Sequence, residues 1–154
     1  CIGGNPIGCE KPGWEFNFGN DVEAANTVLH CGGDIWMIPN NVYGTMHIGF
    51  GEIQRRIAPY GEIGRLLYEN LISFYETENA SWSAGESWSL GDSPAVGVTL
   101  EPNCGSFMYC KAPEVQEDTS YRYPENSPQI RVYTSINSRF IIEDFINKLQ
   151  ILYG

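Results

Sequence analysis

The chain has 154 residues, 42% of them hydrophobic, and a formal net charge of −10. This length and composition fit one globular domain with a hydrophobic core. The negative charge argues against nucleic-acid binding, because proteins that bind phosphate backbones need clustered Lys and Arg. It also argues against an anionic membrane surface, and no apolar run reaches the roughly 20 residues that span a bilayer.

The start of the chain and its cysteines indicate in which cellular compartment the protein is expected. Cys1-Ile2-Gly3-Gly4 lacks the basic region and apolar stretch of a signal peptide, so a cytoplasmic location is the default and secretion stays open. Because the first residue is not Met, we expect a processed product, a clipped fragment or a part of a longer chain. The five cysteines allow a Cys104–Cys110 pair, but a reducing cytosol favours free, half-buried thiols.

Two polar side chains near the N-terminus form the first candidate site. Residues 2–13 are rich in Gly and Pro without a period, so we expect a loop that leads into Trp14–Ala25. Glu15 and Asn17 stand two positions apart, just before a helix start. In an extended segment both point to one face and Phe16 points to the other. Two hydrogen-bonding groups aimed at one spot suit a small polyhydroxylated ligand.

The next elements form an α/β unit. Asn20 or Asp21 caps a helix, and Asn20 with Glu23 matches the capping-box pattern. Gly32-Gly33 ends this helix. Residues 34–39 are a short apolar run with breakers on both sides, which is typical of a buried strand. The apolar face of the helix comprises Val22, Ala25, Val28 and Leu29.

The middle of the chain contains the clearest helix pattern. Residues 61–78 are predicted to be helical, and residues 79–91, rich in Ser, Trp and Gly, are predicted to be an exposed loop. Asp92 is a good N-cap for a following helix, and Pro94 suits its first turn. The apolar stripe of the long helix comprises Ile63, Leu67, Leu71 and Phe74.

The last third of the chain is predicted to be two strands and a helix. The strands cover residues 105–110 and 129–136. In the second strand Ile130, Val132 and Thr134 alternate with polar or exposed positions. Residues 112–128 are acidic, contain three prolines and are predicted to be a loop. The closing helix runs from about Ser138, with its apolar face made by Ile141, Phe145, Leu149 and Leu152.

The N-terminal motif resembles a segment of a known enzyme family. Glu15-Phe16-Asn17 followed by Asp21-Val22-Glu23-Ala24-Ala25 resembles the Glu-Phe-Asn…Asp-x-Glu-Ala-Ala segment of the inosine–uridine type nucleoside hydrolases. The order of the later elements agrees, including Asp92 before a helix that begins Ser-Pro-Ala-Val. The resemblance covers nearly all of the chain. It implies an α/β, Rossmann-like nucleoside hydrolase core, of which residues 1–154 form the C-terminal half as a single region.

The resemblance also implies a reaction and a site. The reaction is hydrolysis of the N-glycosidic bond of a ribonucleoside to base and ribose, through a transition state in which carboxylates stabilise the positive sugar ring. Glu15, Asn17 and Asp92 match residues that bind ribose, and Asp92 also matches a ligand of Ca²⁺. Phe16 matches a pocket residue. We add Trp88 as a candidate for stacking on the base, because it lies close in sequence to Asp92.

The chain departs from the family pattern in several places. The Asp-rich run of the family's N-terminal half is absent, and calcium needs about 6–8 oxygens, so Asp92 alone cannot hold it tightly. Gly91 stands where many members have a His that protonates the leaving base. Cys9, or Asn5 further upstream, stands where the family tends to have an Asn. We therefore expect a half-site, meaning ribose contacts without the remaining machinery, and association with a missing N-terminal half or another copy.

Other interpretations stay open beside this one. One is a catalytically incompetent module that binds a nucleoside or sugar, and another is an unrelated acidic α/β domain. Each site residue also has a structural interpretation: Glu15 as a surface charge, Asn17 as a turn residue, Asp92 as an N-cap only and Phe16 as a core residue.

Overall fold

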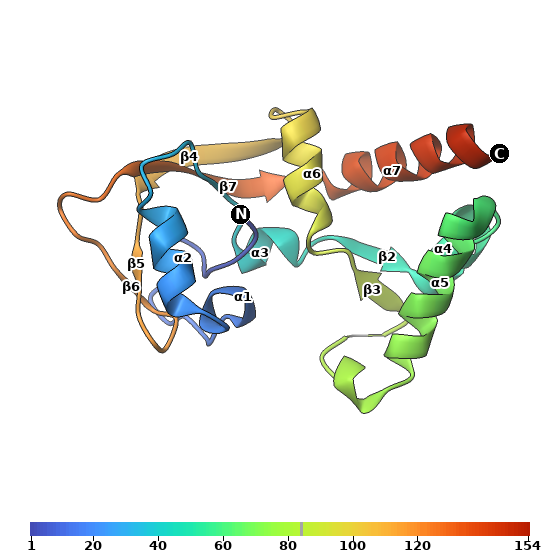
Figure 1. Ribbon diagram of the computed structural model, residues 1–154, viewed down its shortest axis with the longest axis horizontal. Coiled ribbons are helices and arrows are strands. Elements are labelled where there is room, and N and C mark those ends of the chain that lie inside the picture. The colour runs from blue at the N-terminus through green and yellow to red at the C-terminus, as the bar shows by residue number, and fades with distance from the viewer. Residues whose placement is uncertain (84) are drawn as a thin grey trace. The chain divides into compact units, whose positions relative to one another are not determined.

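The computed structural model describes residues 1–83 and 85–154, which form two compact units (Figure 1). Unit 1 comprises Cys1–Gly44 and Asp92–Asn137, and unit 2 comprises Thr45–Gly91 and Ser138–Gly154. Both units contain helices and strands, so the predicted α/β class is confirmed. That residues 1–154 form a single region stays a prediction.

A three-stranded sheet lies at the centre of unit 1. Its order is β1 (Trp36–Met37), β7 (Gln129–Ile136) and β4 (Gly105–Lys111), with β1 parallel and β4 antiparallel to β7. The three predicted strands are therefore confirmed, although the first is only two residues long. Ile2 forms an isolated parallel bridge with Ile38, which places the N-terminal loop beside β1.

The alternation predicted for β7 fails in its second half. Ile130 and Val132 are buried, but Tyr133 is buried as well and Thr134 is exposed. The pairing of β7 with β4 shifts its register between Ser106 and Phe107, where Thr134 of β7 is the extra residue, and such an irregularity shifts which side chains face each other. The buried Tyr133 hydroxyl donates a hydrogen bond to the Pro102 carbonyl at 3.1 Å, which satisfies its polar atom.

The helix α2 (Val22–Leu29) lies against this sheet's core. Its N-cap is Asp21, whose carboxylate accepts from the Ala24 N–H at 2.8 Å. Asn20 is instead the C-cap of a preceding short helix, α1 (Phe16–Gly19), so the predicted capping box is wrong. The hydrophobic cluster between helix and sheet comprises Phe18, Leu29, Met37, Ala112, Val115, Ile130 and Val132.

The segment predicted to be a loop at 112–128 contains a small hairpin. Its strands are β5 (Glu114–Val115) and β6 (Tyr121–Arg122), which pair antiparallel. Figure 1 shows this hairpin beside α2, and the Asn26 side chain bonds the Val115 backbone from both of its polar atoms, at 2.8 and 2.9 Å. The loop prediction is wrong for these residues, because strands of two residues are too short to give a pattern and the supporting Asn26 carboxamide is distant in sequence.

Two further short helices complete unit 1, α3 (Asn40–Tyr43) and α6 (Ser93–Leu100). Unit 2 contains a strand pair, β2 (His47–Gly49) with β3 (Ser87–Ser89), and β3 lies inside residues 79–91, where the sequence predicted an exposed loop. Its other elements are α4 (Phe50–Arg56), α5 (Gly61–Tyr75), the 3-10 turn Glu78–Ala80 and α7 (Ser138–Tyr153).

The apolar faces predicted for the two long helices are confirmed in part. On α5, Leu67 and Leu71 are partly buried but Ile63 and Phe74 are exposed. The buried position of α5 is Gly64, where a Cβ would lie 2.1 Å from the Ile57 carbonyl oxygen. On α7 the predicted Ile141 and Leu149 are buried, together with Ile142 and Ile146, whereas the predicted Phe145 and Leu152 are exposed.

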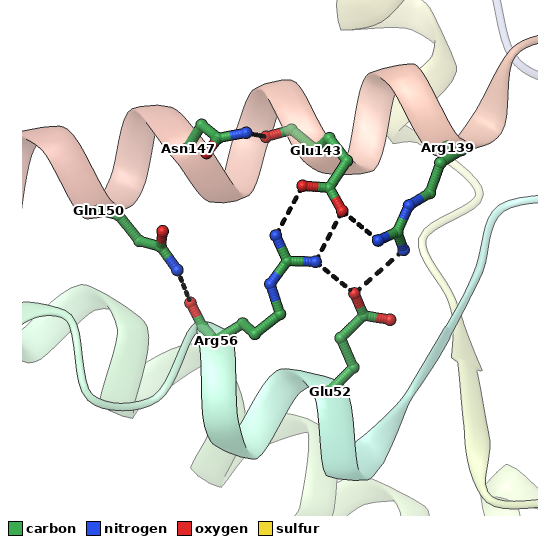
Figure 2. Close-up of polar contacts among 6 residues, drawn as sticks. All are labelled: Glu52, Arg56, Arg139, Glu143, Asn147 and Gln150. Atoms are coloured by element: carbon green, nitrogen blue, oxygen red, sulfur yellow. Dashed lines mark hydrogen bonds and ion pairs between the residues drawn. The ribbon is translucent and has the colours of Figure 1, made fainter.

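Charged side chains join α7 to α4 within unit 2. Figure 2 shows the Arg56 guanidinium between two carboxylates, at 2.6 Å from both oxygens of Glu143 and 2.7 Å from Glu52. Arg139 adds an ion pair to each of the same two glutamates. The Arg–Glu143 contact is bidentate, which is the strongest geometry for such pairs.

Among the helices that the structure describes, none is both long and apolar enough to cross a membrane. All five cysteines are free thiols, and Cys104 is buried while Cys110 is partly buried.

Candidate functional site

Glu15 is a buried carboxylate surrounded by four hydrogen-bond donors. Its Oε1 accepts from the Asn17 N–H at 3.1 Å and from the Tyr43 hydroxyl at 2.7 Å. Its Oε2 accepts from the N–H groups of Gly4 at 2.7 Å and Phe18 at 2.9 Å. The residue is 2% exposed, so it is not a surface charge. A carboxylate has about four acceptor positions, and all of them are occupied here.

The local backbone follows from these bonds. Glu15 is extended and is the N-cap of α1, which begins at Phe16. Asn17 therefore lies in a helical turn, and the predicted extended arrangement of Glu15 and Asn17 is wrong. Phe16 is 64% exposed, and its ring packs edge-on against the ring of Trp14, with 6.2 Å between the ring centroids. Its assignment to a pocket stays a prediction.

The turn between β5 and β6 contains Thr119, which bonds the Glu15 backbone. The Glu15 N–H donates to Thr119 Oγ1 at 2.8 Å, and Thr119 Oγ1 donates to the Gly13 carbonyl at 3.2 Å. Thr119 adopts φ 63°, a left-handed conformation that costs a β-branched residue free energy. A strained residue beside Glu15 indicates that the surrounding contacts fix this segment firmly.

Asn5 has a structural role in the same network. It is 3% exposed, and its side-chain nitrogen donates to the carbonyls of Gly13 at 3.0 Å and Thr119 at 3.1 Å. Its side-chain oxygen accepts from Asn40 at 3.2 Å. Cys9 is exposed. In this conformation the Asn5 carboxamide has its polar atoms engaged with the chain itself.

Gly4 allows the N-terminal loop to approach the core closely. It adopts φ +85°, and a Cβ at this position would lie 2.6 Å from both the Met37 and the Phe18 side chains. Only a glycine fits this backbone and this contact. The close approach brings the Gly4 N–H within hydrogen-bond distance of Glu15, so Gly4 helps to hold the Glu15 carboxylate in place.

Tyr43 contacts one of the predicted site residues, Glu15, directly. It lies at the end of α3, is half-buried, and its pKa is raised, first by burial and then by the hydrogen bond and charge of Glu15. The Asn17 side chain lowers the Tyr43 pKa in part, and the charge of Asp92 raises it. Glu15 therefore bonds the Tyr43 hydroxyl directly, and Asn17 and Asp92 lie in the same unit, near enough to affect the Tyr43 pKa.

The sequence reasoning missed Tyr43, although a signal was present. Tyr43 follows the carboxyl end of the buried strand β1 after a few residues, and ligands of α/β sheets bind at the carboxyl ends of strands. A polar aromatic residue in that place was therefore a candidate.

Asp92 occupies the N-cap position of α6 but does not cap it. Its side chain makes no capping hydrogen bond, and the residue is exposed. The predicted N-cap is right in position only. The carboxylate thus remains accessible to a ligand.

Trp88 belongs to unit 2. It lies in β3, and its ring packs edge-on against Phe74 at 5.6 Å and Trp82 at 5.2 Å. Stacking of Trp88 on a base stays a prediction. Gly91 ends the same unit and offers no side chain for proton transfer.

The donor set for a metal is small. Within residues 1–83 and 85–154, no group of three His, Cys, Asp or Glu side chains is placed to hold a metal ion. Asp92 offers one accessible carboxylate, whereas the Glu15 oxygens are already bonded. Calcium needs about 6–8 oxygen ligands. These residues alone do not fit a calcium site.

Two clefts in unit 1 lie elsewhere. One of about 410 Å³ is lined by residues of α2, β1 and α6, including Trp36 and Val98, and one of about 560 Å³ includes His30 and Glu114. Neither is lined by Glu15, Asn17 or Asp92. The hydrogen-bonded cluster at Tyr43 therefore stays the candidate site.

Comparison with known proteins bears on the fold. No protein-family model matches the sequence, and a search of curated proteins finds no match. Among solved structures, the plant nucleoside hydrolase PpNRh1 is similar with a TM-score of 0.72 and 16% identity, over 87% of this chain and 46% of that one. A purine-preferring ribonucleoside hydrolase from Gardnerella vaginalis is similar with a TM-score of 0.66 and 17% identity, over 85% of this chain and 44% of that one.

The extent of these matches agrees with the predicted correspondence to one half of such a protein. The chain spans about half the length of the two solved proteins. The conserved feature at this low identity is the backbone arrangement. The chain therefore has the nucleoside hydrolase fold, over about half of its full extent.

Proposed function

We propose that this chain contributes the ribose-binding part of a site that hydrolyses the N-glycosidic bond of ribonucleosides. The observation that carries the proposal is the Tyr43–Glu15 hydrogen bond at 2.7 Å, with Asn17 and Asp92 near enough to affect the Tyr43 pKa. The nucleoside hydrolase fold of the chain adds support. The side chains of these residues are of types that bind hydroxyl groups, and a ribose presents hydroxyl groups.

The proposed roles differ among the three residues. Asn17 is partly exposed and Asp92 is exposed, so both are free to approach a sugar. Glu15 can contact a ribose hydroxyl only if one of its four present hydrogen-bond donors moves away. The Tyr43 hydroxyl is the donor that can do so, because the other three are backbone N–H groups. A negative site of this kind stabilises an oxocarbenium-like sugar, which is the transition state of glycoside hydrolysis.

The proposal includes partners. A neutral nucleoside or another ribose-like small molecule is the ligand, and a further polypeptide segment or a second copy supplies the groups that this chain lacks. In the complete site Asp92 would be one ligand of Ca²⁺, together with carboxylates from elsewhere. The half-length match to solved nucleoside hydrolases supports this division.

A second candidate is a module that binds a nucleoside or sugar without hydrolysis. The observation in its favour is the fully bonded Glu15 carboxylate, together with Gly91, which has no group to protonate a leaving base. Both candidates predict sugar binding, and they differ only in turnover.

The first test is binding of ribose, inosine and uridine to the chain, measured by saturation-transfer NMR and calorimetry. We expect binding that weakens in Asn17→Ala and Asp92→Asn by about tenfold each, which corresponds to loss of one good hydrogen bond to a charged or polar group. Asp34→Asn removes an exposed carboxylate of the same unit outside the cluster and serves as the matched control.

The second test separates the two candidates. Ribose released from inosine or uridine is measured with the chain alone and with the complementary region of a nucleoside hydrolase added. Turnover only in the completed sample favours the enzyme, and binding without turnover in both favours the module. Absence of any binding of ribose or nucleoside in the completed sample would exclude both.

A further inference from the structure

We propose that a cleft at the open edge of the unit 1 sheet receives a β-strand from the complementary segment of the nucleoside hydrolase fold, meaning the part of the matched proteins that this chain does not cover. The inference rests on the proposed function only for the identity of this partner segment. Two features of the chain itself carry the rest, a backbone edge that faces outward and a cleft between two helices beside it.

The N-terminal residues form the outermost segment of the sheet. Ile2 bridges Ile38 in parallel, and Ile38 both donates to the Cys1 carbonyl at 2.9 Å and accepts from the Gly3 N–H at 3.1 Å. In a parallel ladder the residue between two such partners turns its own N–H and C=O to the other side. The Ile2 groups therefore face away from β1, and within the described residues neither forms a backbone hydrogen bond.

A cleft of about 410 Å³, which we call the edge cleft, lies beside this segment. Val28 of α2 lines one side of it, and Ala95 and Val98 of α6 line another, while Cys1 and Trp36 come from the edge of the sheet. Figure 1 shows the N-terminus between α2 and α6. The open edge of the sheet is thus flanked by two helices, with a space between them.

The chemistry of the edge cleft suits a strand. Its polar side chains, Asp34 and Thr99, are exposed, and its other lining residues are of hydrophobic types. Val28 is 45% exposed although it lies on the helix that packs on the sheet. A strand added at Ile2 would pair the outward backbone groups and cover Val28 in one step, which is how strand addition to a sheet edge gains its affinity.

The partner segment follows from the comparisons and from charge. The chain corresponds to 46% and 44% of the two solved proteins, so their fold contains about as much again outside it. A second copy of this chain fits the edge less well, because two molecules of net charge −10 repel each other. It would also bring its own α2 and α6 to an edge that these helices already flank. A strand of the complementary segment brings no second pair of these helices.

The first experiment measures association without nucleoside. The full chain is co-expressed with the residues of the Gardnerella vaginalis hydrolase that it does not match, and the complex is followed by co-purification and sedimentation velocity. We expect a complex that Val28→Glu weakens about tenfold or more, because this change places a charge against an apolar strand. Val96→Glu is the matched control, since Val96 is 62% exposed on α6 and does not line the edge cleft.

We expect the control to change the association by less than about twofold. Absence of a complex, or an equal loss in Val28→Glu and Val96→Glu, overturns the inference. In the chain alone, a dimer that Val28→Glu disperses would show that a second copy occupies the edge cleft, and the proposed partner would be wrong.

The second experiment tests the pairing at Ile2 by amide hydrogen exchange. In the free chain we expect the Ile2 N–H to exchange freely, whereas the Gly3 N–H is protected by the Ile38 carbonyl and serves as the internal reference. In the complex the Ile2 N–H should gain protection. An Ile2 amide that exchanges equally fast in the complex overturns the addition of a strand.

The two experiments also separate this inference from the proposed function. A complex with these properties that binds no ribose or nucleoside means that the proposed function fails and the docking of a strand stands. Ribose binding by a chain that forms no complex has the opposite meaning.

Discussion

The buried Glu15 shows how one residue connects the fold with the site. Three of its four donors are backbone N–H groups, from the N-terminal loop and from α1. The carboxylate therefore fixes two chain segments, and only its fourth donor, Tyr43, faces the candidate sugar site. A residue with both tasks affects stability and binding at once, and the two effects need separate measurements.

The stability effect of Glu15 is tested with Glu15→Gln. Glutamine keeps one acceptor oxygen but replaces the other with an NH₂ group that faces two donors. We expect the free energy of unfolding to fall by about 3 kcal/mol, because buried hydrogen bonds to a charged group are lost and donors stay unpaired. The measurement is urea unfolding followed by circular dichroism.

Glu10→Gln is the control for this change, since Glu10 is an exposed glutamate of the neighbouring loop. We expect its unfolding curve to match that of the wild type within about 0.5 kcal/mol. A Glu15→Gln protein as stable as Glu10→Gln would contradict the four-donor arrangement.

At the scale of the elements, the capping of α2 is the sharpest difference between sequence and structure. The capping-box pattern at Asn20 and Glu23 competes with Asp21, and a pattern of four letters does not decide between two adjacent caps. The structure uses Asp21, because Asn20 closes α1 one position earlier. The short helix α1 has only four residues, which is too few for a periodic signal.

This assignment predicts opposite outcomes for two neighbouring substitutions. Asp21→Ala removes the bond to the Ala24 N–H, and we expect it to lower the free energy of unfolding by about 1 kcal/mol. Asn20→Ala leaves that bond intact and should change stability by less than about 0.5 kcal/mol. Thermal or urea unfolding of the pair checks this, and a larger loss in Asn20→Ala would restore the capping box.

The elements that were predictable share one property, a local pattern. The helices α2, α5 and α7 and the strands β4 and β7 were predicted from the residue types within each segment. The hairpin of Glu114 and Tyr121 was not, because its strands are two residues each, too short for a period, and the Asn26 side chain that bonds Val115 is distant in sequence. The same holds for the site: the sequence motif identified Glu15, Asn17 and Asp92 as candidates, but the bond between Glu15 and Tyr43, 28 positions apart, is a product of long-range packing.

The ion pairs between α4 and α7 predict a pH dependence. The hydrogen bond from Arg56, with the charges of Arg139 and Arg56, holds the pKa of Glu143 below its ordinary value of 4.5. A carboxyl group with a lowered pKa in the folded state contributes stability above its unfolded pKa. This contribution is lost as the pH falls through the folded pKa. We therefore expect the stability difference between wild type and Glu143→Gln to be largest above pH 4.5 and to shrink below it.

Urea unfolding of both proteins from about pH 3 to about pH 7 checks this expectation, because this range brackets the titration of carboxyl groups. Glu69→Gln breaks the exposed Arg65–Glu69 pair of α5 and is the control. Because exposed pairs contribute little, we expect no measurable loss there. A Glu143→Gln difference that does not vary with pH would show that the ion pairs at α7 do not stabilise the folded state.

At the scale of the whole molecule, the chain combines a net charge of −10 with a fold that spans about half of the matched proteins. Acidic groups are plentiful, yet in the described residues they do not gather into a group that can hold a metal ion. Net charge attracts cations weakly and without geometry, whereas a calcium site needs several oxygens in one place. A calcium titration can therefore distinguish the diffuse attraction of cations to the acidic chain from binding at a defined calcium site.

We expect calorimetric titration of the isolated chain with Ca²⁺ to show no binding tighter than about millimolar, because Asp92 supplies a single accessible carboxylate near Tyr43. Any weak heat should fall with added NaCl, as diffuse attraction does, and should be the same in Asp92→Asn and in the control Asp34→Asn. With a complementary nucleoside hydrolase region added, the proposed complete site instead predicts stoichiometric binding that Asp92→Asn weakens and Asp34→Asn does not. Tight, salt-resistant binding by the isolated chain that disappears in Asp92→Asn would mean that this half alone assembles the metal site, and the division of the site between two segments would be wrong.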